Sequence, residues 1–399
     1  MWMQLGSSGP LLRSWQQFLL AQQLLQAAEL GDTGACAVFD EATAAATRRY
    51  QSLHGMRADG IVGEQTLRQA QKDGYAAVAV LPEYTLLYGL RSGASDDWEH
   101  PAALVHAPST FAASALSVVV YLHGIKNNIE NVVRATPADE AFPVADLLGQ
   151  LGRAQRNALL VVPELHYNFH NADPGRLAAP GALRSLLDEI FARLPAPLDG
   201  LQTAALQRLV LISHSGGYHA AAAMALGGGL RVDELYLLDS LYGHEEEFTA
   251  FLTDTLAELA TGAADEQRLG QARRFFNLYT RGGGTAEQSR AQAQKARAAA
   301  ARLQLPESLV FTTDEPLAPE ALSDAKVVIQ RVGSMLTVFF TDTPVRDWPS
   351  AERCRKARPL CDGATRSCTS ARTAWRRSSA PRWTRSSAST PGATSRCST

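Results

Sequence analysis

The sequence has no long hydrophobic run and few cysteines. Its apolar stretches are short, such as residues 117–122, whereas a membrane-spanning helix needs about 20 consecutive apolar residues. We therefore expect no membrane span. Four of the five cysteines lie after residue 350, and their spacings fit no zinc knuckle. The body of the chain thus does not depend on a disulfide framework, and we expect no metal ion or cofactor.

A secretory signal is also missing from the first residues. Signal peptides carry a basic start followed by an unbroken apolar block, but Arg13, Gln16 and Gln17 interrupt the apolar residues here. The sequence therefore leaves the localisation open. A hydrophobic share of 46% and a charged share of 20% are those of a folded protein. Because 399 residues exceed one ordinary core, we expect two folded domains.

The net charge of −2 conceals a large difference between the body and the C-terminal tail. Residues 351–399 carry a charge of +9, which leaves −11 for the rest of the chain. Hydrophobic periodicity ends near Trp348, and the composition that follows is typical of GC-rich DNA translated out of frame. We interpret residues 349–399 as a basic low-complexity tail that is either disordered or translated out of frame. The alternative is a basic arm that holds an anionic polymer such as teichoic acid or nucleic acid, although we expect no nucleic-acid partner.

The first 78 residues have the pattern of a compact helical unit. Apolar residues recur at helical spacing over 10–25, Asp40 is placed to cap a second helix over 43–53, and a third helix begins near Gly63. Between the last two helices, residues 55–60 contain two glycines and an aspartate, which favour a tight turn.

The segment that follows residue 37 resembles the second half of a three-helix peptidoglycan-binding domain. It reads VFDEATAAATRRYQSLHGMRADGIVGEQTLRQA. The family pattern is met, with its spacing, by Thr43, Ala46, Tyr50, Gln51, Gly55, Asp59, Gly60, Val62, Gly63 and Thr66. One departure is Asp40, where the family usually has glycine. The resemblance implies peptidoglycan as the partner of residues 1–78.

Residues 79–348 have the pattern of an α/β domain with a mostly parallel sheet flanked by helices. Short β-branched runs alternate with stretches of helical periodicity, and runs such as VVVYL suit strands buried on both faces. We expect an exposed surface helix over 285–303. The predicted strands are 85–90, 103–107, 117–122, 158–162, 208–213, 234–239, 275–280 and 326–332.

Ser215 is the candidate nucleophile. The predicted strand 208–213 runs directly into Ser213-His214-Ser215-Gly216-Gly217, and a helix-compatible stretch follows. A strand, a sharp turn of small residues and a helix resemble the nucleophile elbow of α/β-hydrolases, which lifts a serine hydroxyl above the sheet edge. The family has glycine two residues before the serine, whereas this chain has Ser213, which is also small.

A second turn predicts an oxyanion hole. Residues 118–124, VVVYLHG, resemble the strand and His-Gly turn that precede the first oxyanion amide of α/β-hydrolases. The resemblance implies that the backbone amides of Ile125 and Gly216 would bind the oxygen that becomes negative in the tetrahedral intermediate. It also implies a structural function for His123.

Asp239 is the candidate acid. It ends the predicted strand 234–239, and catalytic groups gather at the carboxyl ends of such strands. The alternative is that Asp239 caps a helix or a turn.

The sequence offers no well-placed catalytic histidine. In the family the histidine follows the last strand, but no histidine follows His244 in this chain. Three explanations are open: His244 could serve by an unusual path, the domain could be inactive, or residues after about Ala351 could replace a native ending that carried the histidine. We favour the third, which translation of the gene in the other two frames would test.

These observations predict a serine hydrolase of ester or amide bonds, esterase- or lipase-like, from a bacterium or a phage. The N-terminal module would deliver it to the cell wall, and the substrate would be an envelope component or a small molecule with an ester or amide bond. The alternative is a peptidoglycan-binding protein with a catalytically inactive hydrolase-like domain. A third interpretation is an intracellular enzyme whose first module is a general interaction domain.

Overall fold

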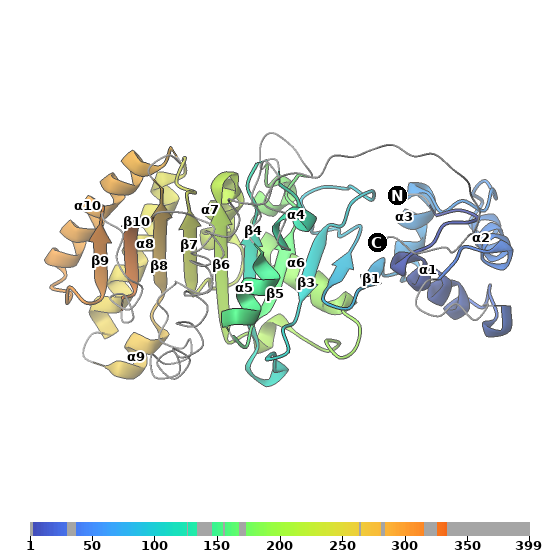
Figure 1. Ribbon diagram of the computed structural model, residues 1–399, viewed down its shortest axis with the longest axis horizontal. Helices are drawn as coiled ribbons and strands as arrows, with labels where there is room; N and C mark the ends of the chain where they lie inside the picture. Colours follow the sequence, from blue (N-terminus) through green and yellow to red (C-terminus); the bar gives the residue numbers. More distant parts are fainter. Residues whose placement is uncertain are drawn as a thin grey trace, which may run out of the picture. The chain divides into compact units, whose positions relative to one another are not determined.

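The computed structural model describes most of the first 332 residues of the chain (Figure 1). The predicted tail, residues 349–399, lies outside the described residues, as do the last 16 residues of the predicted α/β domain. The described ranges are 3–29, 37–125, 127–133, 146–154, 156–166, 173–262, 265–280, 284–314 and 325–332.

The N-terminal module contains the three predicted helices, α1 (Pro10–Ala21), α2 (Glu41–Leu53) and α3 (Glu64–Lys72). Asp40, the departure from the family pattern, accepts a hydrogen bond from the backbone N–H of Thr43 at 2.8 Å and so acts as the N-cap of α2. Trp15 is fully buried among aromatic rings, with the ring centroids of Phe18 and Tyr75 both 5.3 Å away. These rings belong to the same hydrophobic core as one face of the sheet described below.

The family motif of the module forms one hydrogen-bonded turn. The Gln51 side chain accepts from the backbone N–H of Gly60 at 2.9 Å and donates to Asp59 at 3.0 Å and to Thr66 at 3.2 Å. Asp59 also accepts from the N–H of Ile61 at 2.9 Å. The motif residues therefore fix the loop between α2 and α3, whatever further function they have.

The second part is a ten-stranded sheet in the order β1-β2-β3-β5-β4-β6-β7-β8-β10-β9. The three strands at the β1 edge pair antiparallel, β3 is antiparallel to β5, and the pairs from β5 to β9 are parallel. The strands are β1 (Val78–Val80), β2 (Thr85–Leu87), β3 (Ala103–His106), β4 (Ser117–Leu122), β5 (Leu159–Pro163), β6 (Arg208–His214), β7 (Glu234–Leu238), β8 (Arg274–Tyr279), β9 (Val310–Thr313) and β10 (Val327–Arg331).

Helices cover both faces of the sheet, as the apolar strands predict. Alternate residues of β4 show the division: Val119 and Tyr121 join one core with α4 and α5, whereas Val118 and Val120 join a second core with α6, α7, α8 and α10. The helices are α4 (Ile129–Val133), α5 (Leu147–Ala154), α6 (Ala182–Arg193), α7 (Tyr218–Gly227), α8 (Glu245–Gly262), α9 (Glu266–Gln271) and α10 (Ala286–Arg302). The predicted fold class, a helical module followed by a mostly parallel sheet flanked by helices, is confirmed.

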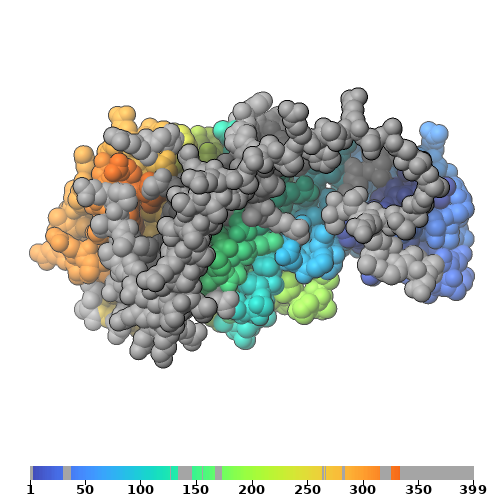
Figure 2. Space-filling model, in the orientation of Figure 1, coloured from blue at the N-terminus to red at the C-terminus, as the bar shows by residue number. Residues whose placement is uncertain are grey.

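One helix differs from the prediction. The expected surface helix is α10, and its outer face does reach the surface, in orange in Figure 2. Its inner face is buried, however, through the small residues Ser289, Ala293, Ala296 and Ala300. Alanine is compatible with either environment, so composition alone did not reveal the buried face. Within the described ranges, none of the helices has both the length and the apolar character needed to cross a membrane.

Candidate active site

Ser215 lies in a sharp turn between strand and helix. Strand β6 ends at His214, residues Ser215–Gly217 form a single 3-10 turn, and α7 begins at Tyr218. The φ angle of Ser215 is +50°, in the left-handed region that residues other than glycine rarely adopt. Such a conformation costs about 1–3 kcal/mol and persists only when the surroundings hold it. The serine is therefore held in a strained backbone, half-buried, at the carboxyl end of a central strand.

Two glycines allow the backbone to pack tightly around Ser215. A Cβ atom on Gly217 would lie 2.6 Å from the carbonyl oxygen of Leu122, so only glycine lets this turn approach the end of β4. A Cβ atom on Gly124 would lie 2.9 Å from the Cβ of Ser215. The turn after β4 therefore packs directly against Ser215. Ile125 directly follows Gly124, and Gly216 directly follows Ser215. Both candidate oxyanion residues therefore lie next to this contact.

Two serines outside the reacting position hold the turn. The Ser240 hydroxyl donates to the carbonyl oxygen of Ser215 at 2.8 Å and also hydrogen bonds to the hydroxyl of Ser213. Both Ser213 and Ser240 are fully buried. Serine in place of the family's glycine at position 213 therefore contributes a hydrogen bond that links β6 to the loop after β7.

His123 binds two backbone segments. It is 1% exposed, its Nδ1 lies 3.0 Å from the carbonyl oxygen of Gly124, and its Nε2 accepts from the backbone N–H of Leu165 at 3.0 Å. The Glu164 carboxylate lies 2.8 Å from the same Nε2. Because both ring nitrogens have partners, His123 joins the turn after β4 to the segment after β5.

Asp239 is tied to the loop after β8. It follows β7, has a φ angle of +42° and is buried. Its carboxylate accepts from the backbone N–H of Thr280 at 2.7 Å, from the Thr280 hydroxyl at 2.5 Å and from the Thr285 hydroxyl at 2.9 Å. Thr285 is the residue at the start of α10. Within the described residues, the side-chain hydrogen bonds of Asp239 thus go to two threonines and to no histidine.

His214, next to the serine, is a neutral imidazole at neutral pH. Its pKa is lowered to about 4, mainly by burial; the nearby Asp239 carboxylate opposes the shift and His123 adds to it. A neutral side chain at this position adds no positive charge to the turn.

Tyr242 is a site residue that the sequence did not reveal. Its hydroxyl hydrogen bonds to Ser215, and its pKa is raised by burial and by the Asp239 carboxylate. Tyr242 therefore stays protonated at neutral pH. The Tyr218 ring lies next to it, with the two ring centroids 6.0 Å apart.

Two histidines and a glutamate lie beside these tyrosines. His219 Nδ1 is 3.1 Å from His244 Nε2, and His244 Nδ1 is 3.0 Å from Glu247 Oε1. His244 has a φ angle of +55°. Both histidines were visible in the sequence, but their pairing was not, because it depends on how the loop after β7 folds over α7. Within the described residues, no group of three His, Cys, Asp or Glu side chains could hold a metal ion.

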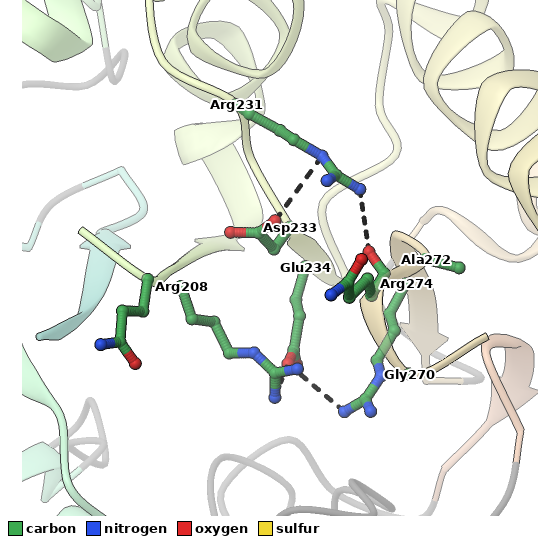
Figure 3. Close-up of a pocket in the computed structure, with 9 residues that line it drawn as sticks. Arg208, Arg231, Asp233, Glu234, Gly270, Ala272 and Arg274 are labelled. Atoms are coloured by element: carbon green, nitrogen blue, oxygen red, sulfur yellow. Dashed lines mark hydrogen bonds and ion pairs between the residues drawn. The ribbon is translucent and has the colours of Figure 1, made fainter. Parts of the chain in front are cut away.

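A separate cavity of about 270 Å³ lies at the amino ends of β6, β7 and β8, away from Ser215 (Figure 3). Its charged side chains form ion pairs: Arg208 and Arg274 with Glu234 at 3.2 and 3.4 Å, and Arg231 with Asp233 at 3.6 Å. No serine or cysteine is among the residues that line it. The cavity therefore offers no serine or cysteine nucleophile.

Comparison with known proteins identifies the N-terminal module. Residues 16–69 match the family model of a putative peptidoglycan binding domain. The matched segment contains the whole motif from Thr43 to Thr66.

Several solved structures resemble the chain at low identity. A hormone-sensitive lipase from a metagenome library is 16% identical, with 58% of this chain and 72% of that chain covered and a TM-score of 0.30. A glucuronoyl esterase from Teredinibacter turnerae is 15% identical, with 65% and 72% covered and a TM-score of 0.32. A ferulic acid esterase is 10% identical, with 61% and 90% covered and a TM-score of 0.33.

Because these scores are low, the fold is assigned from the strand order of this chain and from the turn after β6. The chain thus joins an N-terminal module that matches the putative peptidoglycan binding family to a larger domain with the α/β-hydrolase fold.

Proposed function

We propose that this protein is a serine hydrolase of ester or amide bonds that acts on the bacterial cell wall. Ser215 would be the nucleophile, the backbone amides of Ile125 and Gly216 the oxyanion hole, and Asp239 the acid that orients a histidine. The observation that carries the proposal is the left-handed backbone of Ser215, packed against Gly124 at the carboxyl ends of parallel strands. Strained backbone concentrates at functional sites, and this serine has both the strain and the position.

The proposed reaction is acyl transfer through a covalent intermediate. The Ser215 oxygen attacks the carbonyl carbon of the substrate, and the carbonyl electrons move to the oxygen as the tetrahedral intermediate forms. The two amides donate hydrogen bonds to that oxygen, and one such donor is typically worth about 3 kcal/mol of barrier lowering. Collapse of the intermediate expels the leaving group, and water then releases the acyl group from Ser215.

The N-terminal module, residues 1–78, would hold the hydrolase domain, residues 79–348, on peptidoglycan. The family match to residues 16–69 supports this delivery function. The test is sedimentation of the full-length chain with purified peptidoglycan. Retention of the chain in the pellet supports delivery, whereas a chain that stays in the supernatant supports an enzyme whose first module is a general interaction domain.

An activity-based fluorophosphonate probe tests the nucleophile, because it reacts with activated serines. The full-length chain should be labelled, and Ser215→Ala should remove the label while Ser114→Ala, on an exposed turn, keeps it. A second candidate function is a peptidoglycan-binding protein with an inactive hydrolase domain. It is favoured by one observation, that no histidine follows His244 in the sequence. Absence of labelling in the folded full-length chain would support it.

A further inference from the structure

Three side chains near Ser215 form a chain of hydrogen bonds. His219 Nδ1 is 3.1 Å from His244 Nε2, and His244 Nδ1 is 3.0 Å from Glu247 Oε1. The three residues come from α7, from the loop after β7 and from the first turn of α8. In such a chain each hydrogen bond has one donor and one acceptor. The direction of donation can be assigned by starting from the Glu247 carboxylate.

The Glu247 carboxylate fixes the direction of donation. An ionised carboxylate only accepts hydrogen bonds, and the bond from His244 lowers the pKa of Glu247, so it is ionised at neutral pH. A neutral His244 must therefore carry its hydrogen on Nδ1, which leaves Nε2 as an acceptor. His219 must then donate from Nδ1, which leaves His219 Nε2 with a free lone pair.

His219 is also in the protonation state that a base requires. Burial and the neighbouring His244 lower its pKa, and these effects exceed the opposite effect of the Asp173 carboxylate. The Tyr218 ring packs against His219, and Glu247 acts on His219 through His244. His219 is therefore neutral at neutral pH.

The chain of hydrogen bonds belongs to the Ser215 site. Tyr242, whose hydroxyl hydrogen bonds to Ser215, lies next to Tyr218. The Tyr218 ring in turn lies 4.0 Å from the His219 ring and 5.8 Å from the His244 ring, measured between centroids. Ser215 and His219 also lie four residues apart, on either side of the turn that leads into α7.

We propose that His219 is the general base of Ser215, and that His244 and Glu247 are positioning residues that fix its tautomer and orientation. This inference rests on the part of the proposed function that makes Ser215 the nucleophile, and it replaces Asp239 by Glu247 as the carboxylate that orients the histidine. It also removes the need for a histidine beyond residue 244.

The proton balance of the reaction follows. As the bond between Ser215 Oγ and the carbonyl carbon forms, the hydroxyl proton moves to His219 Nε2, and His219 becomes an imidazolium that hydrogen bonds to His244. The same proton passes to the leaving group when the carbon–heteroatom bond breaks. In the second half, His219 takes a proton from water while the hydroxide oxygen bonds to the acyl carbon, and the proton returns to Ser215 Oγ. Tyr242 shares a hydrogen bond with Ser215 and stays protonated throughout the reaction.

The tautomers are tested directly by nuclear magnetic resonance of the full-length chain labelled with 15N-histidine. His244 and His219 should both show hydrogen on Nδ1 and a bare Nε2 at pH 7.5, a value chosen to be about one unit above the ordinary pKa of histidine. Glu247→Ala should convert His244 to a mixture of tautomers. Glu246→Ala, which removes a neighbouring exposed carboxylate from the same helical turn, should change neither histidine. Hydrogen on Nε2 of His219 in the wild type would overturn the proposal.

The rate of fluorophosphonate labelling at Ser215 separates this inference from the proposed function. His219→Ala should reduce the rate by about 10²–10⁴-fold, the usual contribution of a general base. It should also remove the increase in rate with pH that the wild type shows as His219 loses its proton. His244→Ala and Glu247→Ala should give smaller reductions and move the midpoint of that increase, while His100→Ala and Glu246→Ala should match the wild type.

Each outcome of the labelling experiment is decisive. Equal rates and equal pH profiles for His219→Ala and the wild type would overturn the base assignment and leave Ser215 as the nucleophile. A folded wild type without any label at Ser215 would overturn both proposals. If His219→Ala does not fold, as judged by circular dichroism, the tautomers of the wild type and of Glu247→Ala decide the question.

Discussion

The carboxyl ends and the amino ends of strands β6, β7 and β8 differ in backbone conformation and in how charges are paired. At the carboxyl ends, Ser215 and Asp239 adopt left-handed backbone conformations and hydroxyl groups converge on them. At the amino ends, Glu234 pairs with Arg208 and Arg274 on regular strands (Figure 3). Backbone strain is thus confined to the end where chemistry is proposed, whereas the opposite end has paired charges. Substitutions at the two ends should therefore change different properties.

The largest effect on stability is expected at the amino ends. Glu234 and Arg274 are 1% and 2% exposed, and Glu234→Gln would leave two guanidinium groups near an uncharged amide. Loss of one partner from a buried ion pair typically costs about 3–5 kcal/mol. The free energy of unfolding in urea should fall by that amount, while Ser215 labelling of the folded protein stays within about twofold of the wild type. Glu307→Gln, at an exposed glutamate, is the control and should change neither quantity.

At the carboxyl ends we expect a substitution to change the labelling of Ser215 more than the free energy of unfolding. Gly124→Ala would place a methyl group 2.9 Å from the Cβ of Ser215 and so displace the serine. A misplacement of about 1 Å can reduce a rate about 10²-fold, and the labelling rate of Ser215 should fall by that factor. Gly227→Ala is the matched control, since its new methyl group would meet no atom within 4 Å. Unchanged labelling in Gly124→Ala would contradict the close packing of the two turns.

The sequence alone predicts features at these two ends when they depend on residues close together in the chain, and it does not predict contacts between distant residues. The turn at Ser215 was predictable, because an apolar strand followed by small residues and a helix is a local pattern. The N-cap at Asp40 was predictable for the same reason. The pairing of Glu234 with two arginines was not, because the partners lie on strands far apart in the chain.

The remaining site residues show the same limit. Tyr242 and His244 lie in the loop between β7 and α8, and Glu247 lies in the first turn of α8; the positions of all three depend on how this segment packs against α7. The threonines that bind Asp239 come from the loop after β8. The short strands β1 and β9 were also missed.

A smaller loss of stability is expected when Asp239 loses one donor. Thr285→Val keeps the shape of the side chain but removes the hydroxyl that lies 2.9 Å from the carboxylate. Hydrogen bonds to charged groups contribute about 1.5–3 kcal/mol, so urea unfolding should show a decrease in that range. Thr253→Val, at an exposed threonine of α8, serves as the control. A decrease no larger than that of the control would show that the hydroxyl contributes nothing to holding Asp239.

A small gain of stability is expected when the strain at Ser215 is relieved. Ser215→Gly replaces a strained residue by one that adopts positive φ readily, and the free energy of unfolding should rise by about 1 kcal/mol. Labelling should be abolished in the same variant. A stability equal to that of Ser215→Ala would indicate that the backbone of Ser215 is not strained.

Stability should also depend on pH. His214 has a pKa of about 4 in the folded protein, below its ordinary value of 6.5. The unfolded chain therefore binds a proton more readily than the folded protein between these values, and stability should fall as the pH is lowered from 6.5 to 4. His214→Asn should flatten this part of the stability curve, as measured by urea unfolding at several pH values. If the stability of His214→Asn changes with pH as steeply as that of the wild type, His214 is not the group that makes stability depend on pH between 6.5 and 4.

The central claim, that Ser215 is the reacting group, is tested most directly by locating the fluorophosphonate adduct with tandem mass spectrometry. After digestion of the labelled full-length chain, the added mass should reside on Ser215 and be absent when the chain is unfolded in urea before labelling. An adduct on another serine, or equal labelling of the folded and unfolded chains, would contradict the account.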